Sequence, residues 1–268
     1  MASVPYSNAL KGEYVDLFTD CVATPGRAAV IDKLVDNLVD NRKRYDQVAT
    51  ALDIPWFFIA VIHNMESSQN FNRHLHNGDP LTARTVQVPA GRPAKGNPPF
   101  TWVESATDAL TMHGLDHMPD KSLPRLLYEL ERYNGWGYRL FHPQVKSPYL
   151  WSFSNQYKSG KYVGDGTWSD TATSQQCGAA VLLRRMVERK LIEFEDQPLP
   201  AKKDAPVVVR YAMKLSNKDE DVAAAINLQE WLNTHSGIWV KVDGIPGKNT
   251  SDAYRLVTGR YLPGDPRA

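Results

Sequence analysis

The chain has 268 residues, of which 42% are hydrophobic and 23% are charged, and its formal net charge is +1. This composition is typical of a globular protein with one sizeable core and a small second unit, and the small charge gives no reason to expect a nucleic-acid partner. The 2 cysteines, Cys21 and Cys177, are too few for a disulfide framework. Two buried thiols are the simpler interpretation, and the sequence leaves open whether they pair.

The beginning of the chain, MASVPYSNALKGEYVDLF, lacks the basic segment and apolar stretch of a secretory signal. The longest apolar run, around residues 54–62, is too short to cross a bilayer. We therefore expect a protein that is made in the cytoplasm and has no membrane partner. If its target lies outside the cytoplasm, another agent must release it.

The first predicted helix spans residues 27–50, where apolar side chains recur at helical spacing, with a break near Asn41. A second helix follows, with Asp53 as its N-cap and Pro55 in its first turn. This helix is apolar on every side, so we expect it to be buried and to end within residues 67–70.

The next segment predicts a small β-hairpin. Asn77-Gly78 is a turn signal, and residues 81–88, LTARTVQV, alternate like a strand. A loop rich in proline and glycine then runs to Phe100. Further helices are expected at residues 101–113, 122–133 and 171–192. The predicted fold class is therefore mainly α, with a helical domain over residues 1–195 that contains one small hairpin.

A linker is predicted at residues 196–206, DQPLPAKKDAP, because this stretch is rich in proline and charge and poor in large apolar groups. After it, residues 207–268 have the composition of a small compact domain.

Glu66 stands at the end of the apolar helix, where Ile62 and His63 share its face. Apolar neighbours disfavour a charged carboxylate, and so does the negative end of the helix dipole, so the pKa of Glu66 should be raised. A carboxyl that stays protonated near neutral pH can act as a general acid on a glycosidic oxygen. The simpler alternative is a glutamate that only reaches solvent.

The residues around Glu66 resemble a known superfamily. VIHNMESSQNF resembles the first motif of soluble lytic transglycosylases and goose-type lysozymes, in which a hydrophobic helix ends in Glu-Ser and the glutamate is the catalytic acid. LYELERYNGWGYR is similar to their Ala-Tyr-Asn-x-Gly motif, with Arg132 in place of alanine. The resemblance implies that Tyr133 and Asn134 line the sugar cleft and that Gln87, in TVQVPAG, is the cleft glutamine.

This resemblance extends over residues 27–190 and includes bacterial and phage lysozyme-family proteins. It implies a lysozyme-like helical domain. Sugars stack on flat aromatic faces, so Trp136 and Trp151 are candidate sugar-binding residues. His63 is a further candidate for a sugar contact.

Asp79 is the candidate second carboxylate, because glycoside hydrolases usually pair an acid with a base or nucleophile. Phage-type lysozymes have a similar order, with a glutamate at a helix end and then Asp-x5-Thr across a hairpin. Thr85 takes the threonine position here, although the gap between Glu66 and Asp79 is longer. The resemblance implies that Asp79 activates water and that Thr85 helps to hold it. The alternative is that Asp79 only stabilises its turn.

The histidines near this site do not predict a metal centre. His63, His74 and His76 lie close to Asp79 in the sequence, but their spacing matches no common zinc motif. We expect no metal and no cofactor, and we interpret these histidines as groups that orient carboxylates or contact sugar.

The tail resembles a small helical peptidoglycan-binding module. That module carries Leu-Gln-x-x-Leu on one helix and Val-Asp-Gly-x-x-Gly-x-x-Thr before another, and LQEWL and VDGIPGKNT are similar to these motifs. The matching residues are Asp243, Gly244, Gly247 and Thr250. Glycines permit the tight turn, and Asp243 and Thr250 can hold it and cap the next helix. A packing domain without a ligand is the alternative.

Together, the residues and the resemblance predict a monomeric muramidase that cleaves peptidoglycan glycan strands between N-acetylmuramic acid and N-acetylglucosamine. A lytic transglycosylase is the nearest alternative, in which the C6 hydroxyl of muramic acid replaces water and Glu66 works nearly alone. A non-catalytic wall-binding protein and a chitinase on the same fold are the others. The sequence leaves the source of the gene and the choice between inversion and retention open.

Overall fold

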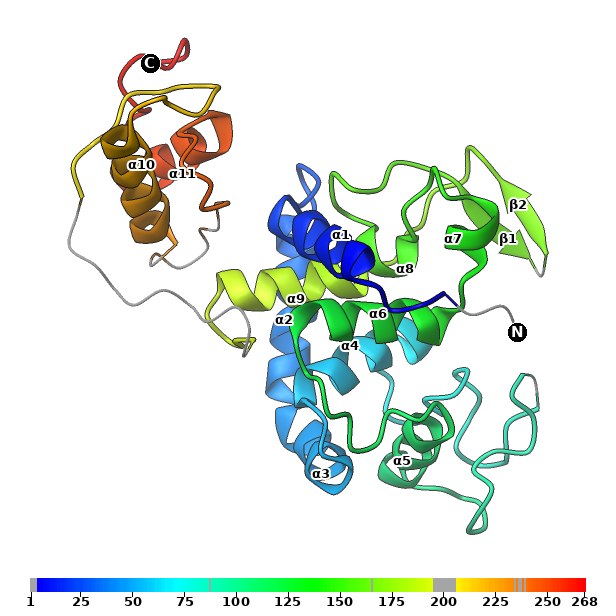
Figure 1. Ribbon diagram of the computed structural model, residues 1–268. Helices are drawn as coiled ribbons and strands as arrows, with labels where there is room; N and C mark the ends of the chain where they lie inside the picture. The colour runs from blue at the N-terminus through cyan, green and yellow to red at the C-terminus, as the bar shows by residue number, and fades with distance from the viewer. Residues whose placement is uncertain are drawn as a thin grey trace. The chain divides into compact units, whose positions relative to one another are not determined.

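The computed structural model describes residues 4–86, 88–164, 166–194, 206–233, 235, 238 and 240–268. It is mainly helical, with 46% helix and 5% strand, which confirms the prediction of a mainly α protein. Figure 1 shows the elements, whose bounds are α1 (Asn8–Thr19), α2 (Ala28–Asp40), α3 (Arg42–Leu52), α4 (Trp56–Ser67), α5 (Trp102–Met112), α6 (Leu123–Asn134), α7 (Gly137–Phe141), α8 (Pro148–Trp151), β1 (Lys161–Gly164), β2 (Thr167–Ser169), α9 (Ala179–Glu188), α10 (Asp219–Leu232) and α11 (Lys248–Thr258).

The chain divides into two compact units. Most of the larger unit comes from residues 21–185, and most of the smaller unit comes from the tail that begins at residue 197. The predicted linker, residues 196–206, lies outside the described residues except for Pro206.

The break that the sequence predicts near Asn41 is confirmed, because Asn41 lies between the end of α2 and the start of α3. The predicted N-cap of the next helix is wrong. Asp53 ends α3 in the left-handed conformation, with φ of 51°, and its carboxylate pairs with Lys121 at 2.7 Å. Pro55, in extended conformation, is the residue that precedes α4.

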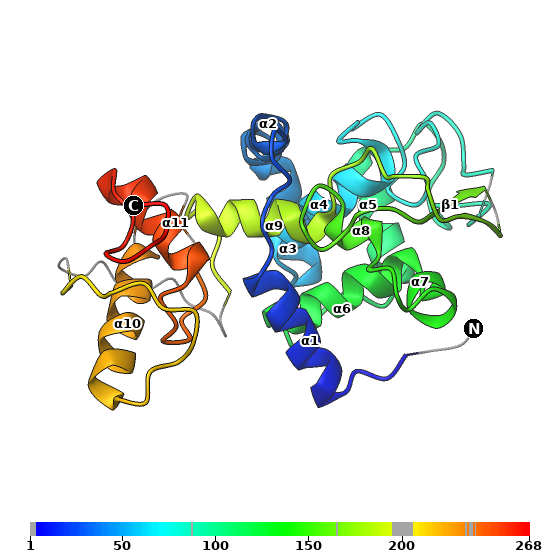
Figure 2. The same ribbon diagram turned by 90° about the horizontal axis from the view of Figure 1, so that it is seen from above.

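Helix α4 is the centre of the larger unit. It packs against α2 and α3, and both views show it enclosed by the other helices (Figures 1 and 2). Every side chain from Trp56 to Asn64 is buried, as the all-round apolar pattern predicts. Burial contributes about 1.5–3 kcal/mol for each large apolar side chain, so packing rather than intrinsic helix propensity stabilises α4.

One finding bears on membranes. In the described part of the chain, no single helix is long and apolar enough to cross a bilayer, and α3 and α4 pass that test only as a pair bent by 115°.

The end of α4 is held by several hydrogen bonds. Ser68 adopts the left-handed conformation there, and its N–H donates to the carbonyl oxygen of Asn64. The side-chain amide of Gln176 donates to the carbonyl oxygens of Asn64 and Met65 at 2.9 and 2.8 Å. These bonds satisfy carbonyl groups that a helix end leaves without partners. They give Glu66, the next residue, a fixed backbone.

The predicted strand at residues 81–88 is wrong for the residues that are described there. A single bridge joins Arg73 and Pro80, and Thr85 then pairs with the backbone of Gly91 and Arg92, so the segment folds back on itself as a loop. Pro80 and Pro89 stand at either end of this segment, where neither can donate an N–H to a ladder. The small hairpin of the fold lies later, where β1 pairs with β2 in antiparallel register.

The predicted helix at 171–192 is shorter in the structure, because α9 begins only at Ala179. Gly178 explains this start. Its N–H donates to the carbonyl oxygen of Ser152 at 2.9 Å, and a Cβ at this position would collide with the carbonyl group of Leu150. Close approach of two backbones therefore fixes where α9 begins.

The smaller unit has a hydrophobic core of its own. Six buried side chains form it: Leu228, Leu232, Ile238, Val240, Ala253 and Leu262. They come from α10, α11 and the segments that follow each of them.

Candidate active site

Glu66 lies one residue before the end of α4, and its side chain is half-buried. Its Oε1 atom accepts a hydrogen bond of 2.8 Å from the hydroxyl of Tyr149 on α8. Burial raises the pKa of the Glu66 carboxyl to about 7, against the smaller lowering effect of that hydrogen bond. A carboxyl with this pKa carries its proton for a large fraction of the time at neutral pH, which is what a general acid requires.

Two tyrosines lie beside this carboxyl. Burial raises the pKa values of Tyr149 and Tyr133 well above the usual range, and the charge of Glu66 raises both further. Both hydroxyls therefore stay protonated and act as donors, Tyr149 to Glu66 and Tyr133 to the carbonyl oxygen of Leu75 at 3.1 Å. The ring of Tyr133 stacks on His113, with centroids 4.1 Å apart. This stacking fixes Tyr133 at the side of Glu66.

Sequence reasoning missed Tyr149 and selected its neighbour Trp151. The structure corrects this choice, because Trp151 is 1% exposed and belongs to the core. Trp136 is also buried, and its ring packs against Tyr128 with centroids 5.0 Å apart. Neither tryptophan offers an open face to a sugar. The only signal for Tyr149 was its place in PYLWSF, two residues from Trp151, and no spacing rule separates the two aromatic residues.

His63 is a core residue, which corrects the expectation that it contacts sugar. Its side chain is fully buried, its Nδ1 atom lies 3.0 Å from the hydroxyl of Tyr45, and the rings of Phe71 and Trp102 pack on it. Burial lowers the pKa of His63 to about 4. The imidazole is therefore neutral at pH 7 and forms part of the packing behind the site.

Asp79 lies in a turn that touches the end of α4. A Cβ added to Gly78 would lie only 3.0 Å from the carbonyl oxygen of Glu66, so the turn and the helix end are in direct contact. The Oδ2 atom of Asp79 accepts hydrogen bonds from the Asn77 amide at 3.0 Å and from the Val86 N–H at 2.9 Å. These bonds fix the position of the carboxylate. Asp79 therefore stabilises its turn, which is the alternative role that the sequence indicates.

Thr85 is buried, and its hydroxyl is committed to the loop backbone. It donates to the carbonyl oxygen of Pro89 at 2.5 Å and accepts from the N–H of Arg92 at 2.9 Å. This arrangement corrects the expectation that Thr85 holds a water molecule for Asp79. Its role in the structure is to close the loop that follows the Asp79 turn.

The histidines of HLH anchor the Asp79 segment to α5. His74 and the Leu75 N–H bond to the hydroxyl of Ser105 at 2.8 and 3.1 Å. His76 lies 2.8 Å from Asp108, which also pairs with Arg92 at 2.8 Å. The network connects residues on both sides of Asp79 to one rigid helix.

The other residues that the lysozyme resemblance singles out are Arg132, Asn134 and Gln87. Tyr133 is followed by Asn134, which ends α6 and is exposed. Gln87 lies outside the described residues. Arg132, the departure from the expected alanine, pairs with Glu129 at 2.5 Å and donates to the carbonyl oxygen of His113 at 2.7 Å. It therefore links α6 to the end of α5.

In the tail, Gln229 of LQEWL organises the VDGIPGKNT turn. Its amide nitrogen donates to Asp243 and Thr250 at 2.9 and 3.2 Å, and its amide oxygen accepts from the backbone N–H groups of Asp243 and Gly244 at 3.0 and 2.9 Å. Gln229 is 1% exposed and Thr250 is 3% exposed. The motif residues therefore build the turn from inside.

The two glycines of the motif have structural roles as well. Gly244 has φ of 72°, and a Cβ there would lie 2.8 Å from Val222, so this position requires glycine. Gly247 immediately precedes α11, whose first turn has no side-chain cap. The sequence assigns Asp243, Gly244, Gly247 and Thr250 to a wall-binding module, and in the structure these residues form its turn, with Gly244 and Thr250 buried. A pocket of about 550 Å3 lies along residues 207–216 of the tail, and Gly244 and Pro246 of the motif turn also line it.

No group of three or more His, Cys, Asp and Glu side chains among the described residues is placed to hold a metal ion. Cys21 and Cys177 form no disulfide, and both are buried. Comparison of the chain with protein-family models, with curated proteins and with solved structures gave no significant match.

Proposed function

We propose that the protein is a peptidoglycan hydrolase, a muramidase that cleaves the β-1,4 bond between N-acetylmuramic acid and N-acetylglucosamine. One observation carries this proposal. Glu66 is a half-buried carboxyl at the end of a rigid buried helix, with a pKa raised to about 7 and one oxygen held by Tyr149. A positioned carboxyl that keeps its proton at neutral pH is the acid that glycosidic bond cleavage requires.

In this mechanism Glu66 donates its proton to the oxygen of the scissile bond. Because Tyr149 occupies Oε1, the proton lies on Oε2, which faces the substrate in our proposal. As the bond breaks, Glu66 becomes a carboxylate, and the Tyr149 hydroxyl stabilises the new charge. Asp79, whose turn abuts the end of α4, is the second carboxylate and removes a proton from the attacking water.

The hydrogen bonds of Asp79 are the observation that favours the alternative, a lytic transglycosylase. One of its oxygens already accepts two hydrogen bonds from its own loop. If Asp79 serves only that loop, the C6 hydroxyl of muramic acid attacks instead of water, and Glu66 acts as acid and base in turn. A non-catalytic wall-binding protein is the further alternative, and it provides no reason for a carboxyl with a raised pKa.

Mass spectrometry of the fragments released from purified sacculi tests these alternatives. We expect fragments with reducing muramic acid ends. Fragments with 1,6-anhydro ends would identify a transglycosylase, reducing ends on glucosamine would identify a glucosaminidase, and no release by the full chain would exclude an enzyme of this class. Glu66→Gln is the matched inactive variant, and Glu220→Gln, an exposed position on α10, is its control.

We also propose that the tail binds the cell wall. Its separate core and its turn built around Gln229 support a domain with its own fold, and the pocket along residues 207–216 is the candidate place for a ligand.

A further inference from the structure

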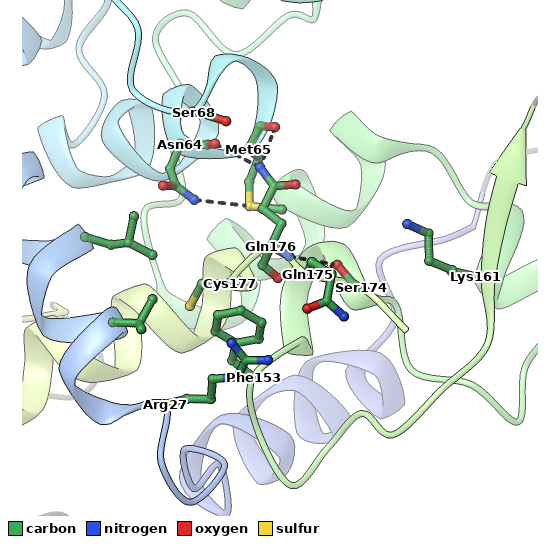
Figure 3. A pocket seen from close by; sticks show the side chains of 12 residues that line it. Arg27, Asn64, Met65, Ser68, Phe153, Lys161, Ser174, Gln175, Gln176 and Cys177 are labelled. Atoms are coloured by element: carbon green, nitrogen blue, oxygen red, sulfur yellow. Dashed lines mark hydrogen bonds between the residues drawn. The ribbon is translucent and has the colours of Figure 1, made fainter. Parts of the chain in front are cut away.

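A second cavity lies beside the end of α4 (Figure 3). Its volume is about 650 Å3, which is within the range of pockets that hold small organic ligands. Its walls come from α2, the end of α4, β1 and the segment before α9. The residues that matter for its chemistry are Arg27, Phe153, Lys161, Ser174 and Gln175.

The charge of this cavity is entirely positive. Among the described residues of its lining, Arg27 and Lys161 are charged and none is an aspartate or a glutamate. Neither cation forms an ion pair with any described residue. The guanidinium of Arg27 lies 4.3 Å from the ring centre of Phe153, which fixes its position. Two cations without a counter-charge in one recess attract an anion.

The two cations enter the cavity from different parts of the fold. Figure 3 shows Arg27 beside Phe153 at one end and Lys161 on β1 at the other, with Ser174, Gln175 and Gln176 between them. This separation favours a ligand with two spaced anionic groups over one small ion.

The rest of the lining fits a peptide. Ser68, Ser174 and Gln175 provide amide and hydroxyl groups, and these are the partners that peptide N–H and C=O groups use. Asn64 is buried and its side-chain oxygen accepts from Gln69 at 2.9 Å, so it belongs to the wall. Val30, Leu34 and Met65 provide an apolar wall. The side-chain amide of Gln176 already donates to the backbone of α4, so this side chain is held in place as part of the cavity wall.

The cavity is close to Glu66 but distinct from it. Asn64, Met65 and Ser68 line it, and they flank Glu66 in the sequence. At 100° per residue, however, the Glu66 side chain leaves α4 on a different side from Asn64 and Ser68. A ligand in the cavity therefore binds beside the acid without occupying its Oε2 atom.

We propose that this cavity binds a short acidic peptide, namely the peptide that is attached to the muramic acid units of the substrate, with its carboxylates at Arg27 and Lys161. This inference rests on the proposed function for the identity of the peptide. It gives the enzyme a preference for glycan strands that carry peptides over naked strands. The peptide also orients the strand, because it is joined to the sugar next to the scissile bond.

The test uses the full chain with Glu66→Gln, so that no substrate is consumed. Calorimetric titration measures the affinity for a disaccharide–tetrapeptide, for the same disaccharide without its peptide, and for the free tetrapeptide. The double variant Arg27→Gln with Lys161→Gln removes both cations. Lys33→Gln with Lys158→Gln removes two exposed cations outside the cavity and is the control with the same net charge.

We expect the cavity variant to bind the disaccharide–tetrapeptide and the free peptide at least about tenfold more weakly, as the loss of two charge-assisted contacts implies. Its affinity for the peptide-free disaccharide and the affinities of the control variant stay unchanged. Equal losses in the control variant, or no loss for the peptide ligands, would overturn the proposal. Binding is measured with the inactive Glu66→Gln variant, and release from sacculi is measured with the wild type. If the variant binds the peptide but the wild type releases nothing, the proposed function is refuted and the peptide site is not.

Discussion

The hydroxyl of Tyr149 donates a hydrogen bond of 2.8 Å to Oε1 of Glu66. Two opposing effects act on this carboxyl: burial raises its pKa and the hydrogen bond lowers it. Burial is the larger effect, so the pKa is about 7 and the proton remains available for transfer near neutral pH. Tyr149 cannot donate its own proton, because its pKa is raised well above the usual range. In the proposed mechanism it is therefore a positioning residue, and Oε2 carries the proton.

The first prediction concerns this hydrogen bond. Tyr149→Phe removes a donor that stabilises the carboxylate, so the pKa of Glu66 should rise above about 7. The alkaline limb of the rate against pH should then move to higher pH, while the rate at its maximum falls roughly tenfold, because the carboxyl loses its fixed orientation. The measurement is the pH profile of lysis of purified sacculi.

Tyr254→Phe is the control for this change, since it removes a hydroxyl in the other unit of the chain. An unshifted alkaline limb in Tyr149→Phe, together with a lower rate, would mean that Tyr149 supports only the fold and does not act on the acid.

The second prediction concerns Glu66 itself and its linkage to stability. Glu66→Gln should abolish lysis, because an amide has no acid proton to donate. The folded-state pKa of about 7 is above the ordinary value of 4.5, so the stabilising contribution of the protonated carboxyl is present below pH 4.5 and is lost as the pH rises through 7. Relative to Glu66→Gln, the wild type should therefore lose on the order of 3 kcal/mol of unfolding free energy over this range.

Urea unfolding of both proteins near pH 4 and near pH 8 measures this difference. A wild type that keeps the same stability relative to Glu66→Gln at both pH values would contradict a raised pKa, and residual lysis by the variant above a few per cent would contradict the acid role.

The sequence predicts the scaffold of this site better than its details. The all-round apolar pattern of residues 56–64 correctly indicates a buried helix, and the raised pKa expected for Glu66 at its end is also found. The break at Asn41 is also readable, because the polar residues after it interrupt the apolar spacing. These features depend on local periodicity, which a single sequence contains.

The misplaced features depend on contacts between distant segments. Tyr149 reaches Glu66 across 83 positions of the chain, and nothing local distinguishes it from the buried Trp151. The Thr85 hydroxyl is taken by backbone atoms of a loop whose path the sequence does not reveal. In the tail, VDGIPGKNT is a recognisable pattern, but only the structure shows that Gln229 holds it from inside.

The third prediction separates a hydrolase from a transglycosylase. Asp79→Asn keeps an oxygen that can accept from the Val86 N–H but removes the basic carboxylate. If Asp79 activates water, turnover should fall about 100-fold or more, as expected for the loss of a general base. Asp40→Asn, at the exposed end of α2, is the control. A rate near that of the wild type, with anhydro ends on the products, would assign the reaction to a transglycosylase.

Thr85→Val gives a complementary result and is the fourth prediction. It leaves the N–H of Arg92 and the carbonyl oxygen of Pro89 without their partner, so the unfolding free energy should fall by about 1–3 kcal/mol. The rate should fall much less than in Asp79→Asn when both are measured well below their melting temperatures. A loss of turnover in Thr85→Val as large as that in Asp79→Asn, without loss of stability, would restore Thr85 as a residue that holds water.

The last prediction concerns the tail. A wall-binding domain raises the effective concentration of the enzyme at its polymer and leaves the chemical step unchanged. Deletion of residues 205–268 should therefore preserve the rate on short soluble glycan fragments and lower the rate on intact sacculi. The isolated tail should sediment with insoluble peptidoglycan.

A single substitution in the full chain, Gln229→Leu, tests the same point. It leaves the N–H groups of Asp243 and Gly244 unpaired and should disrupt the turn. Equal lysis of sacculi by the truncated and the full chain would show that the tail does not serve as a binding domain, and failure of the truncated chain to fold would show that both units depend on one core.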